Sequence, residues 1–176
     1  MMKSKSIRLT PNSYALLALL DQMGEGTSYD IKQAIEVSIQ NFWPVPHTTA
    51  YEEPARLAKG GYLTARQEEG GRRRRVYSLT DAGREALAAW ADEPTASPPQ
   101  LREEAVLKIF AGGPPAPLLE GRIAWHRGKI EELKGLLEAL TGTEGYERSE
   151  RTLQVGIVYH RKMLEMIEEV TPPAEN

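Results

Sequence analysis

Residues 48–80, TTAYEEPARLAKGGYLTARQEEGGRRRRVYSLT, combine the signals of a short helix, a tight stop and a strand hairpin. Apolar residues recur at helical spacing at the start of the stretch, and the Gly60-Gly61 pair ends that helix. The runs 62–67 and 72–79 have strand composition, and the loop sequence EEGG precedes the second run, which begins with four consecutive arginines. A helix followed by a cationic hairpin predicts a winged helix-turn-helix, in which the helix enters the major groove of DNA and the hairpin follows the backbone.

Two capped helices are expected before this stretch. Thr10 followed by Pro11 is typical of a helix N-terminus, so the leucine-rich run that follows predicts a buried helix and not a cleavable leader. Thr27, with Asp30 three residues later, has the spacing of a capping box and begins a second helix. The glycines between the two helices predict an irregular break.

Composition limits the classes of protein to consider. The 176 residues suffice for one large domain or two small ones, and the apolar content of 40% supports a buried core. The chain contains no cysteine, which excludes disulfides and thiolate metal sites and suits a reducing cytosol. No apolar run approaches the roughly 18 residues of a membrane span. We therefore expect a cytoplasmic protein.

Formal charge is segregated along the chain. The total is −3, but the residues up to Trp90 include 12 basic and 10 acidic side chains, whereas the remainder has 10 basic and 15 acidic ones. Phosphate binding depends on local charge and not on the total. The mildly basic N-terminal part therefore remains a candidate for nucleic-acid contact.

Two long amphipathic helices are predicted in the C-terminal part. They follow the proline-rich linker EPTASPP at 93–99 and a shorter helix near 101–110. In 117–140 and 148–170, apolar residues and one histidine per helix recur at alternating spacings of four and three, the heptad pattern of a coiled-coil seam. Two such seams suggest a dimerisation module. The residues assigned to the dimer interface are Leu119, Ile123, His126, Ile130, Leu133, Leu153, Ile157, His160 and Leu164.

The expected fold is mainly α with a small β-hairpin. A winged helix-turn-helix DNA-binding domain over residues 1–92 is followed by an antiparallel helical dimerisation domain over residues 100–172. In the short helix that opens the second domain, the predicted apolar face consists of Leu101, Ala105, Val106, Ile109 and Phe110.

Five motifs of the chain resemble those of one bacterial family. They are TPNSYALLALL at 10–20, SYDIKQAIE at 28–36, FWPVPHTTAYEEPARLAKGGYL at 42–63, GRRRRVYSLTDAGREAL at 71–87 and LREEAVLKIF at 101–110. The family is the PadR transcriptional repressors. The resemblance implies a dimeric, cytoplasmic, DNA-binding repressor that releases DNA on binding phenolic acids, drugs or other small molecules. The chain departs from the family at Pro46, where serine is usual, and at Pro54, where leucine is usual.

Candidate DNA contacts come from the predicted recognition helix and the hairpin. They are His47, Thr48, Thr49, Tyr51, Arg56, Arg72, Arg73, Arg74 and Arg75. Hydroxyls and cations of this kind bind phosphates, and a threonine methyl can contact thymine. Three plainer readings stay open: Thr49 forms a capping box with Glu52, Tyr51 packs partly in the core with Ala55 and Ala58, and the arginine run is a solvated strand edge.

Pro54 lies past the first turn of the expected recognition helix. A proline there clashes with the carbonyl of Ala50 and removes one backbone hydrogen bond, at a cost of about 3 kcal/mol in a helix interior. We expect a kinked but continuous helix, and the alternative is a restart at Glu53 with Pro54 as the first helical residue.

Tryptophans and histidines suggest further sites. Trp43, Trp90 and Trp125 are candidates for binding a flat aromatic effector, and ordinary core packing is the alternative for each. His126 and His160 interrupt the two seams, but neither has a carboxylate three or four residues later. We therefore expect core histidines that set register, no metal site and no cofactor.

Catalysis is not expected. The chain lacks a cysteine nucleophile, a glycine-rich phosphate loop and a GxSxG motif. The second function considered is a dimeric winged-helix module that binds proteins and has lost specific DNA binding. Pro54 and the glutamates Glu52 and Glu53 of the recognition helix keep that alternative open.

Overall fold

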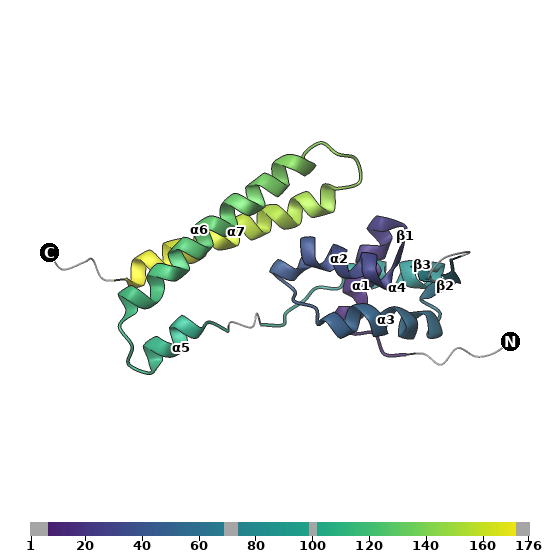
Figure 1. Cartoon of the computed structure of the whole chain (residues 1–176), viewed down its shortest axis with the longest axis horizontal. Coiled ribbons are helices and arrows are strands. Elements are labelled where there is room, and N and C mark those ends of the chain that lie inside the picture. The colour runs from purple at the N-terminus through teal and green to yellow at the C-terminus, as the bar shows by residue number, and fades with distance from the viewer. Residues whose placement is uncertain (1–6, 69–73, 99–101, 172–176) are drawn as a thin grey trace. The chain divides into compact units, whose positions relative to one another are not determined.

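The structure is a computed structural model that describes residues 7–68, 74–98 and 102–171. The chain divides into two compact units, 1–96 and 97–176. Figure 1 shows the elements of both units.

The N-terminal unit contains four α-helices, a 3-10 turn and three strands among its described residues. The elements are α1 (Pro11–Met23), β1 (Glu25–Thr27), α2 (Ser28–Val37), η1 (Ile39–Asn41), α3 (His47–Lys59), β2 (Leu63–Gln67), β3 (Arg75–Leu79) and α4 (Asp81–Asp92). The helix start predicted at Thr10 and the capping box predicted at Thr27 are confirmed, and the structure adds a capping box of Thr10 with Ser13. The Thr80 hydroxyl accepts from the Gly83 amide to cap α4.

A three-stranded antiparallel sheet lies beside these helices in the order β1-β3-β2. The predicted hairpin is confirmed as β2 and β3, with Leu63 opposite Leu79 and Gln67 opposite Arg75. The sequence reading missed β1, which pairs Gly26 with Tyr77. Three residues with a central glycine carry no alternating pattern, and their partner lies about fifty positions away, so only tertiary pairing reveals the strand.

One hydrophobic core holds the N-terminal unit together. Leu16, Leu17 and Leu20 of α1 are fully buried, together with Ile31 of α2 and Leu57 of α3. The leucine run of α1 is therefore enclosed by the other elements, as its composition predicted.

Helix α3 differs from the prediction at its start, and its predicted continuity through Pro54 is confirmed, whereas the predicted kink stays a prediction. Pro46 occupies the N-cap and no side chain caps the helix, so the proposed capping box of Thr49 with Glu52 is wrong. The helix begins one turn earlier than that box would require. It then runs continuously through Pro54, as we expected, so a restart at Glu53 does not occur.

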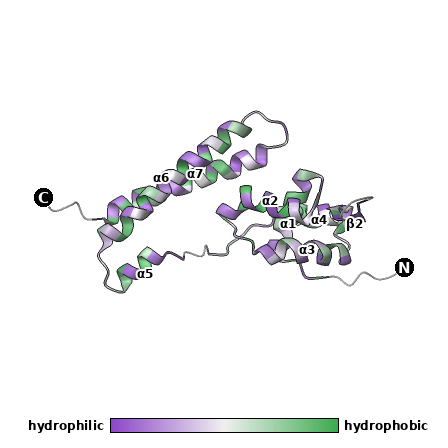
Figure 2. Cartoon of the chain, in the orientation of Figure 1, coloured by the Kyte–Doolittle hydropathy of each residue, from purple (hydrophilic) through white to green (hydrophobic). Residues whose placement is uncertain are grey.

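The C-terminal unit is entirely helical in its described residues. Its elements are α5 (Glu104–Phe110), α6 (Pro115–Leu140) and α7 (Glu147–Val170). Helices α6 and α7 lie side by side along their length and are joined by a short loop (Figure 1). Hydrophilic and hydrophobic residues alternate around both helices in Figure 2, as the heptad pattern predicted. Together with the N-terminal unit, this confirms a mainly helical winged-helix fold.

The heptad seams pack against each other within one chain. Ile130, Leu133 and Ile157 form one buried cluster between α6 and α7, and Leu119 and Ile167 share another with Ala105 of α5. Most of the residues assigned to a dimer interface are thus already buried inside the hairpin. Their assignment to a contact between subunits stays a prediction, and the apolar surface still available to a partner lies on other residues.

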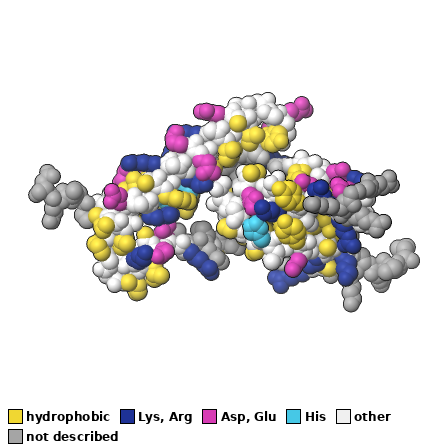
Figure 3. Space-filling view, in the orientation of Figure 1, with side chains coloured by type: hydrophobic (Ala, Val, Ile, Leu, Met, Phe, Trp, Pro, Cys, Tyr) yellow, Lys and Arg dark blue, Asp and Glu magenta, His cyan; other side chains and the backbone are white. Residues whose placement is uncertain are grey.

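Helix α5 buries less than predicted. Ala105 is buried and Ile109 packs beside it, but Val106 is half exposed and Phe110 is 88% exposed. Leu101 lies outside the described residues. Hydrophobic side chains consequently gather on the surface over α5 (Figure 3). In the described part of the chain, no helix combines the length and the apolar character required to cross a membrane.

Candidate nucleic-acid interface

Helix α3 presents one face to the surface and buries the other. His47, Thr48 and Tyr51 are exposed, Tyr51 at 51%. Ala50 and Leu57 on the opposite side are buried in the core. The helix is therefore anchored by its buried face and exposes polar side chains along its N-terminal half.

Thr49 and Glu52 complete the predicted helix surface. Thr49 is half buried, and Glu52 is exposed beside Tyr51. An exposed carboxylate on this face would repel phosphate and could accept a hydrogen bond from cytosine. The face is thus mixed in charge and not uniformly basic.

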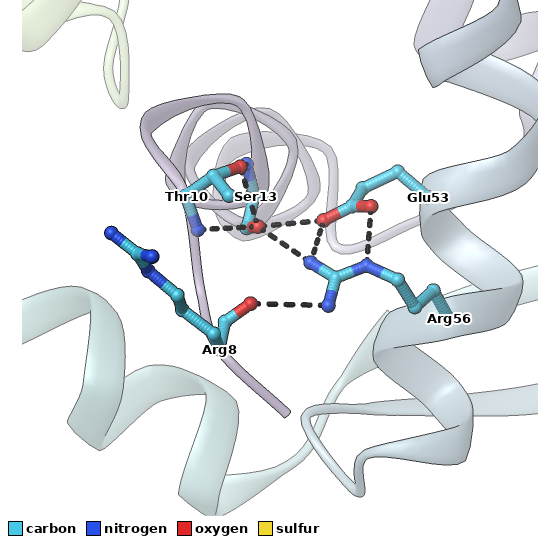
Figure 4. Close-up of polar contacts among 5 residues, drawn as sticks. All are labelled: Arg8, Thr10, Ser13, Glu53 and Arg56. Atoms are coloured by element: carbon cyan, nitrogen blue, oxygen red, sulfur yellow. Dashed lines mark hydrogen bonds and ion pairs between the residues drawn. The ribbon is translucent and has the colours of Figure 1, made fainter. Parts of the chain in front are cut away.

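Arg56 is occupied by contacts within the N-terminal unit. Its Nε atom donates to Glu53 Oε2 over 2.7 Å, and its Nη2 atom donates to Ser13 Oγ over 3.0 Å. Its Nη1 atom donates to the Arg8 carbonyl over 3.1 Å, so the side chain points toward α1 (Figure 4). Glu53 neutralises much of the guanidinium charge. Sequence spacing alone did not indicate that Arg56 contacts Ser13 of α1.

The same contacts shift two pKa values. The hydrogen bond from Arg56 lowers the pKa of Glu53, with a further contribution from the Ser13 hydroxyl. The carboxylate raises the pKa of Arg56 in return. Both groups are therefore charged at neutral pH, and the pair is a true ion pair.

The hairpin supplies cations next to this helix in sequence. Arg75 is exposed at the start of β3, and Arg74 lies 3.8 Å from Glu68 across the hairpin. Arg72 and Arg73 lie outside the described residues. The structure adds Arg66 of β2, which the sequence reading missed; it is exposed and contacts Glu25 over 3.2 Å. Its place in the strand paired with the arginine run is the signal that would have found it.

A small cavity of about 210 Å³ lies between α2 and the start of α3. Lys32 and His47 line it and share one carboxylate, because Glu36 lies 2.8 Å from Lys32 and 3.8 Å from His47. Lys32, the lysine that lines this cavity, is thus also paired within the chain.

The three tryptophans have separate surroundings. Trp43 is exposed and donates from Nε1 to Asn12 Oδ1 over 2.8 Å. Trp90 stacks on Tyr14 with ring centroids 4.6 Å apart. Trp125 belongs to the C-terminal unit, where Arg122 lies 4.5 Å above its ring. Their role in effector binding stays a prediction.

His126 and His160 form a buried pair in the α6–α7 seam. Their Nδ1 atoms are 2.9 Å apart, so one ring donates to the other. Burial lowers the pKa of both, for His160 to about 4, and the neighbouring His126 adds to the shift of His160. Among residues 7–68, 74–98 and 102–171, no group of three or more histidine or carboxylate side chains is arranged to hold a metal ion. The pair lies between the helices, as expected of core histidines.

The sheet order, the exposed face of α3 and the cationic hairpin define a winged helix-turn-helix protein. Residues 16–89 match the profile described as the transcriptional regulator PadR-like family. Over these residues the chain is similar to PadR-like transcriptional regulators. The family consists of regulators and not of enzymes, in agreement with the sequence reading.

Known proteins resemble the chain beyond the matched profile. The negative transcriptional regulator PadR of Bacillus subtilis (strain 168) is 28% identical over 134 residues, which cover 72% of this chain and 73% of the relative. The crystal structure of Bacillus subtilis PadR with operator DNA superposes with a TM-score of 0.77 at 23% identity, covering 90% of this chain and 95% of that one. The structure of that PadR with p-coumaric acid gives 0.71 at 20% identity, covering 93% and 96%. These structural likenesses establish the fold.

Proposed function

We propose that the chain is a cytoplasmic transcriptional repressor that binds operator DNA as a homodimer and releases it on binding a small aromatic effector. The main support for DNA binding is the exposed face of α3. His47, Thr48 and Tyr51 are exposed on this helix, and its opposite face is buried in the core. We add Thr49 of the same helix and the hairpin arginines to the proposed DNA contacts. Bacillus subtilis PadR, a negative regulator of the same architecture, has been solved with operator DNA and with p-coumaric acid.

Residues 1–92 are assigned to DNA binding and residues 100–172 to dimerisation. The apolar side chains that α5 and α7 leave exposed support the second assignment, because the described residues of this unit do not cover them. They are Val106, Leu107, Phe110, Val155, Val158 and Tyr159. Replacing Leu107 and Phe110 by glutamate should give a folded monomer in sedimentation experiments. A dimer of unchanged stability would place the interface elsewhere.

DNA binding is tested with labelled DNA from upstream of the chain's own gene. Binding should be saturable and weaken as salt rises. Replacing Arg72 and Arg73 by alanine should weaken binding to all sequences about equally and reduce the salt slope by roughly 0.9 per lost phosphate contact. The control replaces Arg151 and Arg161 of α7 by alanine, which makes the same change in charge in the other unit. An equal loss in both variants would mean that only total charge matters.

Effector binding is tested by titration with phenolic acids and planar cations. We assign the effector contacts to Trp43, Trp90 and Trp125, and Trp90 is the first to test because its ring already stacks on Tyr14. Fluorescence quenching and DNA release should occur at the same ligand concentration, and Trp90→Phe should shift both. Quenching without DNA release would refute the coupling, because a ligand shifts an equilibrium only by binding one state better.

The alternative is a winged-helix module that binds proteins. The pairing of Arg56 with Glu53 and the exposed Glu52 favour it, because both reduce positive charge on α3. Absence of any salt-dependent DNA binding by the parent chain would select this alternative.

A further inference from the structure

Pro54 creates a weak point in the middle of α3. Proline has no amide hydrogen to donate to the carbonyl of Ala50, and its ring disfavours helical geometry at the preceding residue, Glu53. The weak point separates residues 47–53, which carry the exposed recognition side chains, from residues 55–59. The helix is nevertheless continuous. Some interaction outside the helix backbone must contribute to holding the two halves in line.

A three-residue cluster spans this weak point. Glu53 lies just before Pro54, and Arg56 lies just after it; Figure 4 shows both directed at Ser13 of α1. The ion pair joins the two halves of α3 across the proline, with Arg56 Nε donating to Glu53 Oε2 over 2.7 Å. We name Ser13, Glu53 and Arg56 the α1–α3 clamp.

Ser13 anchors the clamp to α1. Its side chain is 0% exposed, and its Oγ atom accepts from the Thr10 amide over 2.8 Å and from Arg56 over 3.0 Å. A hydroxyl has one proton, so with two donors already bound it donates that proton to Glu53 Oε1, 2.6 Å away. The direction of the bond between Ser13 and Glu53 is therefore determined.

Electrostatics favours the same arrangement. Ser13 is in the first turn of α1, where the helix dipole is positive, and the Glu53 carboxylate lies against this end. Arg56 adds a second anchor by donating to the Arg8 carbonyl just before the helix. Because hydrogen bonds to charged groups in a half-buried site are strong and directional, the clamp constrains the rotation of α3 more tightly than apolar packing alone.

We propose that the α1–α3 clamp is a specificity-determining device, which sets the tilt of residues 47–53 across Pro54 and thereby the operator sequence preferred, without touching DNA. This inference rests on the proposed DNA binding. Ser13, Glu53 and Arg56 act as positioning residues, and His47, Thr48 and Tyr51 make the contacts. A misplacement of those contacts changes the discrimination between base pairs more than it changes attraction to the phosphates.

The experiment compares Ser13→Ala and Glu53→Gln with the control Glu85→Gln. The control makes the same charge change as Glu53→Gln on an exposed position of α4. For each variant, affinity is measured for the operator, for its single-base variants and for unrelated DNA over a range of salt, after correction for the active fraction. Amide hydrogen exchange of residues 50–56 is measured without DNA.

Both clamp variants should lower the ratio of operator to unrelated affinity by about fivefold or more, the scale of one impaired base contact. Ser13→Ala should leave the salt slope unchanged, because no phosphate contact is lost. Exchange across Pro54 should accelerate, and the control should match the parent. Ser13→Ala removes only one hydroxyl, so it keeps the test valid if Glu53→Gln fails to fold.

A second background isolates the proline. In Pro54→Ala the missing amide is restored, so adding Glu53→Gln should change the affinity ratio less than it does in the parent. An unchanged ratio in Ser13→Ala and Glu53→Gln, or an equal effect with and without Pro54, would overturn the clamp while leaving DNA binding intact. A parent chain that binds no DNA would instead refute the proposed function, and the role of the clamp in it.

Discussion

The two units bury their apolar side chains in different ways. The N-terminal unit has a single cluster of 13 buried residues drawn from helices, strands and a loop. The C-terminal unit has two clusters of three buried residues each, and it leaves large side chains such as Leu107 and Phe110 on the surface. Because burial of apolar surface is the main stabilising term, the first unit is stabilised by one large shared core, whereas the second depends on two small clusters between its helices. Both units also leave large apolar side chains exposed, among them Val37 and Phe42 in the first.

The two units also differ in what their buried polar groups do. Ser13 and Thr27 in the N-terminal unit are buried, and both take part in capping boxes that determine where helices begin. In the C-terminal unit His126 and His160 are buried in the seam, and His126 Nε2 has no hydrogen-bond partner among the described residues. A buried polar atom without a partner destabilises its surroundings. In the first unit the buried polar groups determine where helices begin, whereas in the second unit the buried histidine pair reduces stability.

The largest effect should come from charging the seam of the C-terminal unit. Ile130→Lys with Leu133→Lys would place two cations in the buried apolar cluster between α6 and α7, where burial disfavours charge. We expect loss of the α6–α7 hairpin and of any dimer, with the N-terminal unit still folded. Circular dichroism and sedimentation measure the two effects. A dimer of unchanged mass and helicity would refute the intrachain seam.

Truncating a core residue should show whether the N-terminal unit unfolds independently of the C-terminal unit. Leu17→Ala removes a fully buried side chain and should destabilise that unit by about 2–5 kcal/mol in urea unfolding followed by Trp43 and Trp90 fluorescence. Phe110→Ala is the matched control, since its side chain is 88% exposed and should leave that transition in place. Equal shifts would mean that the two units unfold as one.

Acidification should affect the C-terminal unit first. The pKa of His160 falls to about 4 in the folded chain, against about 6.5 when unfolded, so the unfolded state binds more protons between these values. Stability is therefore complete above about pH 6.5 and decreases as pH falls toward 4. The Glu53 contribution, whose pKa is lowered from 4.5, is lost only below that value. Thermal unfolding followed at several pH values should show α6 and α7 melting earlier at pH 5 than at pH 7.5.

The matched variant for this window replaces both histidines by leucine. The seam then has no titrating group at these positions, and the loss of stability between pH 6.5 and 4 should largely disappear. A parent chain whose C-terminal melting is independent of pH over this range would contradict the depressed pKa values.

The smallest effect concerns a single helix cap. Thr80→Ala removes the hydroxyl that accepts from Gly83 and donates to the Gly61 carbonyl, and should cost about 1 kcal/mol in the N-terminal unit. Thr80→Ser retains both hydrogen bonds and is the control. Equal losses in the two variants would assign the effect to the threonine methyl instead of the cap.

Local signals in the sequence determined much of this fold. The caps at Thr10, Thr27 and Thr80 set helix starts, because a side-chain oxygen satisfies an amide within three residues. The loop between two β-rich runs predicted the hairpin, and the heptad spacing predicted two long paired helices. The sequence also placed Tyr51 on the expected recognition helix, but its helical spacing with Ala55 and Ala58 allowed a core position as well, and the structure shows that Tyr51 is exposed.

Tertiary structure decided what depends on distant partners. Strand β1 exists only because Gly26 pairs with Tyr77. The heptad residues of α6 and α7 face each other within one chain because α7 folds back on α6. The sequence predicted that Arg56 contacts DNA. In the structure its guanidinium instead pairs with Glu53 and donates hydrogen bonds to Arg8 and Ser13, which lie more than forty residues away. Periodicity gives the face on which a side chain lies, but the group that faces it across the fold is set by packing, which no local pattern encodes.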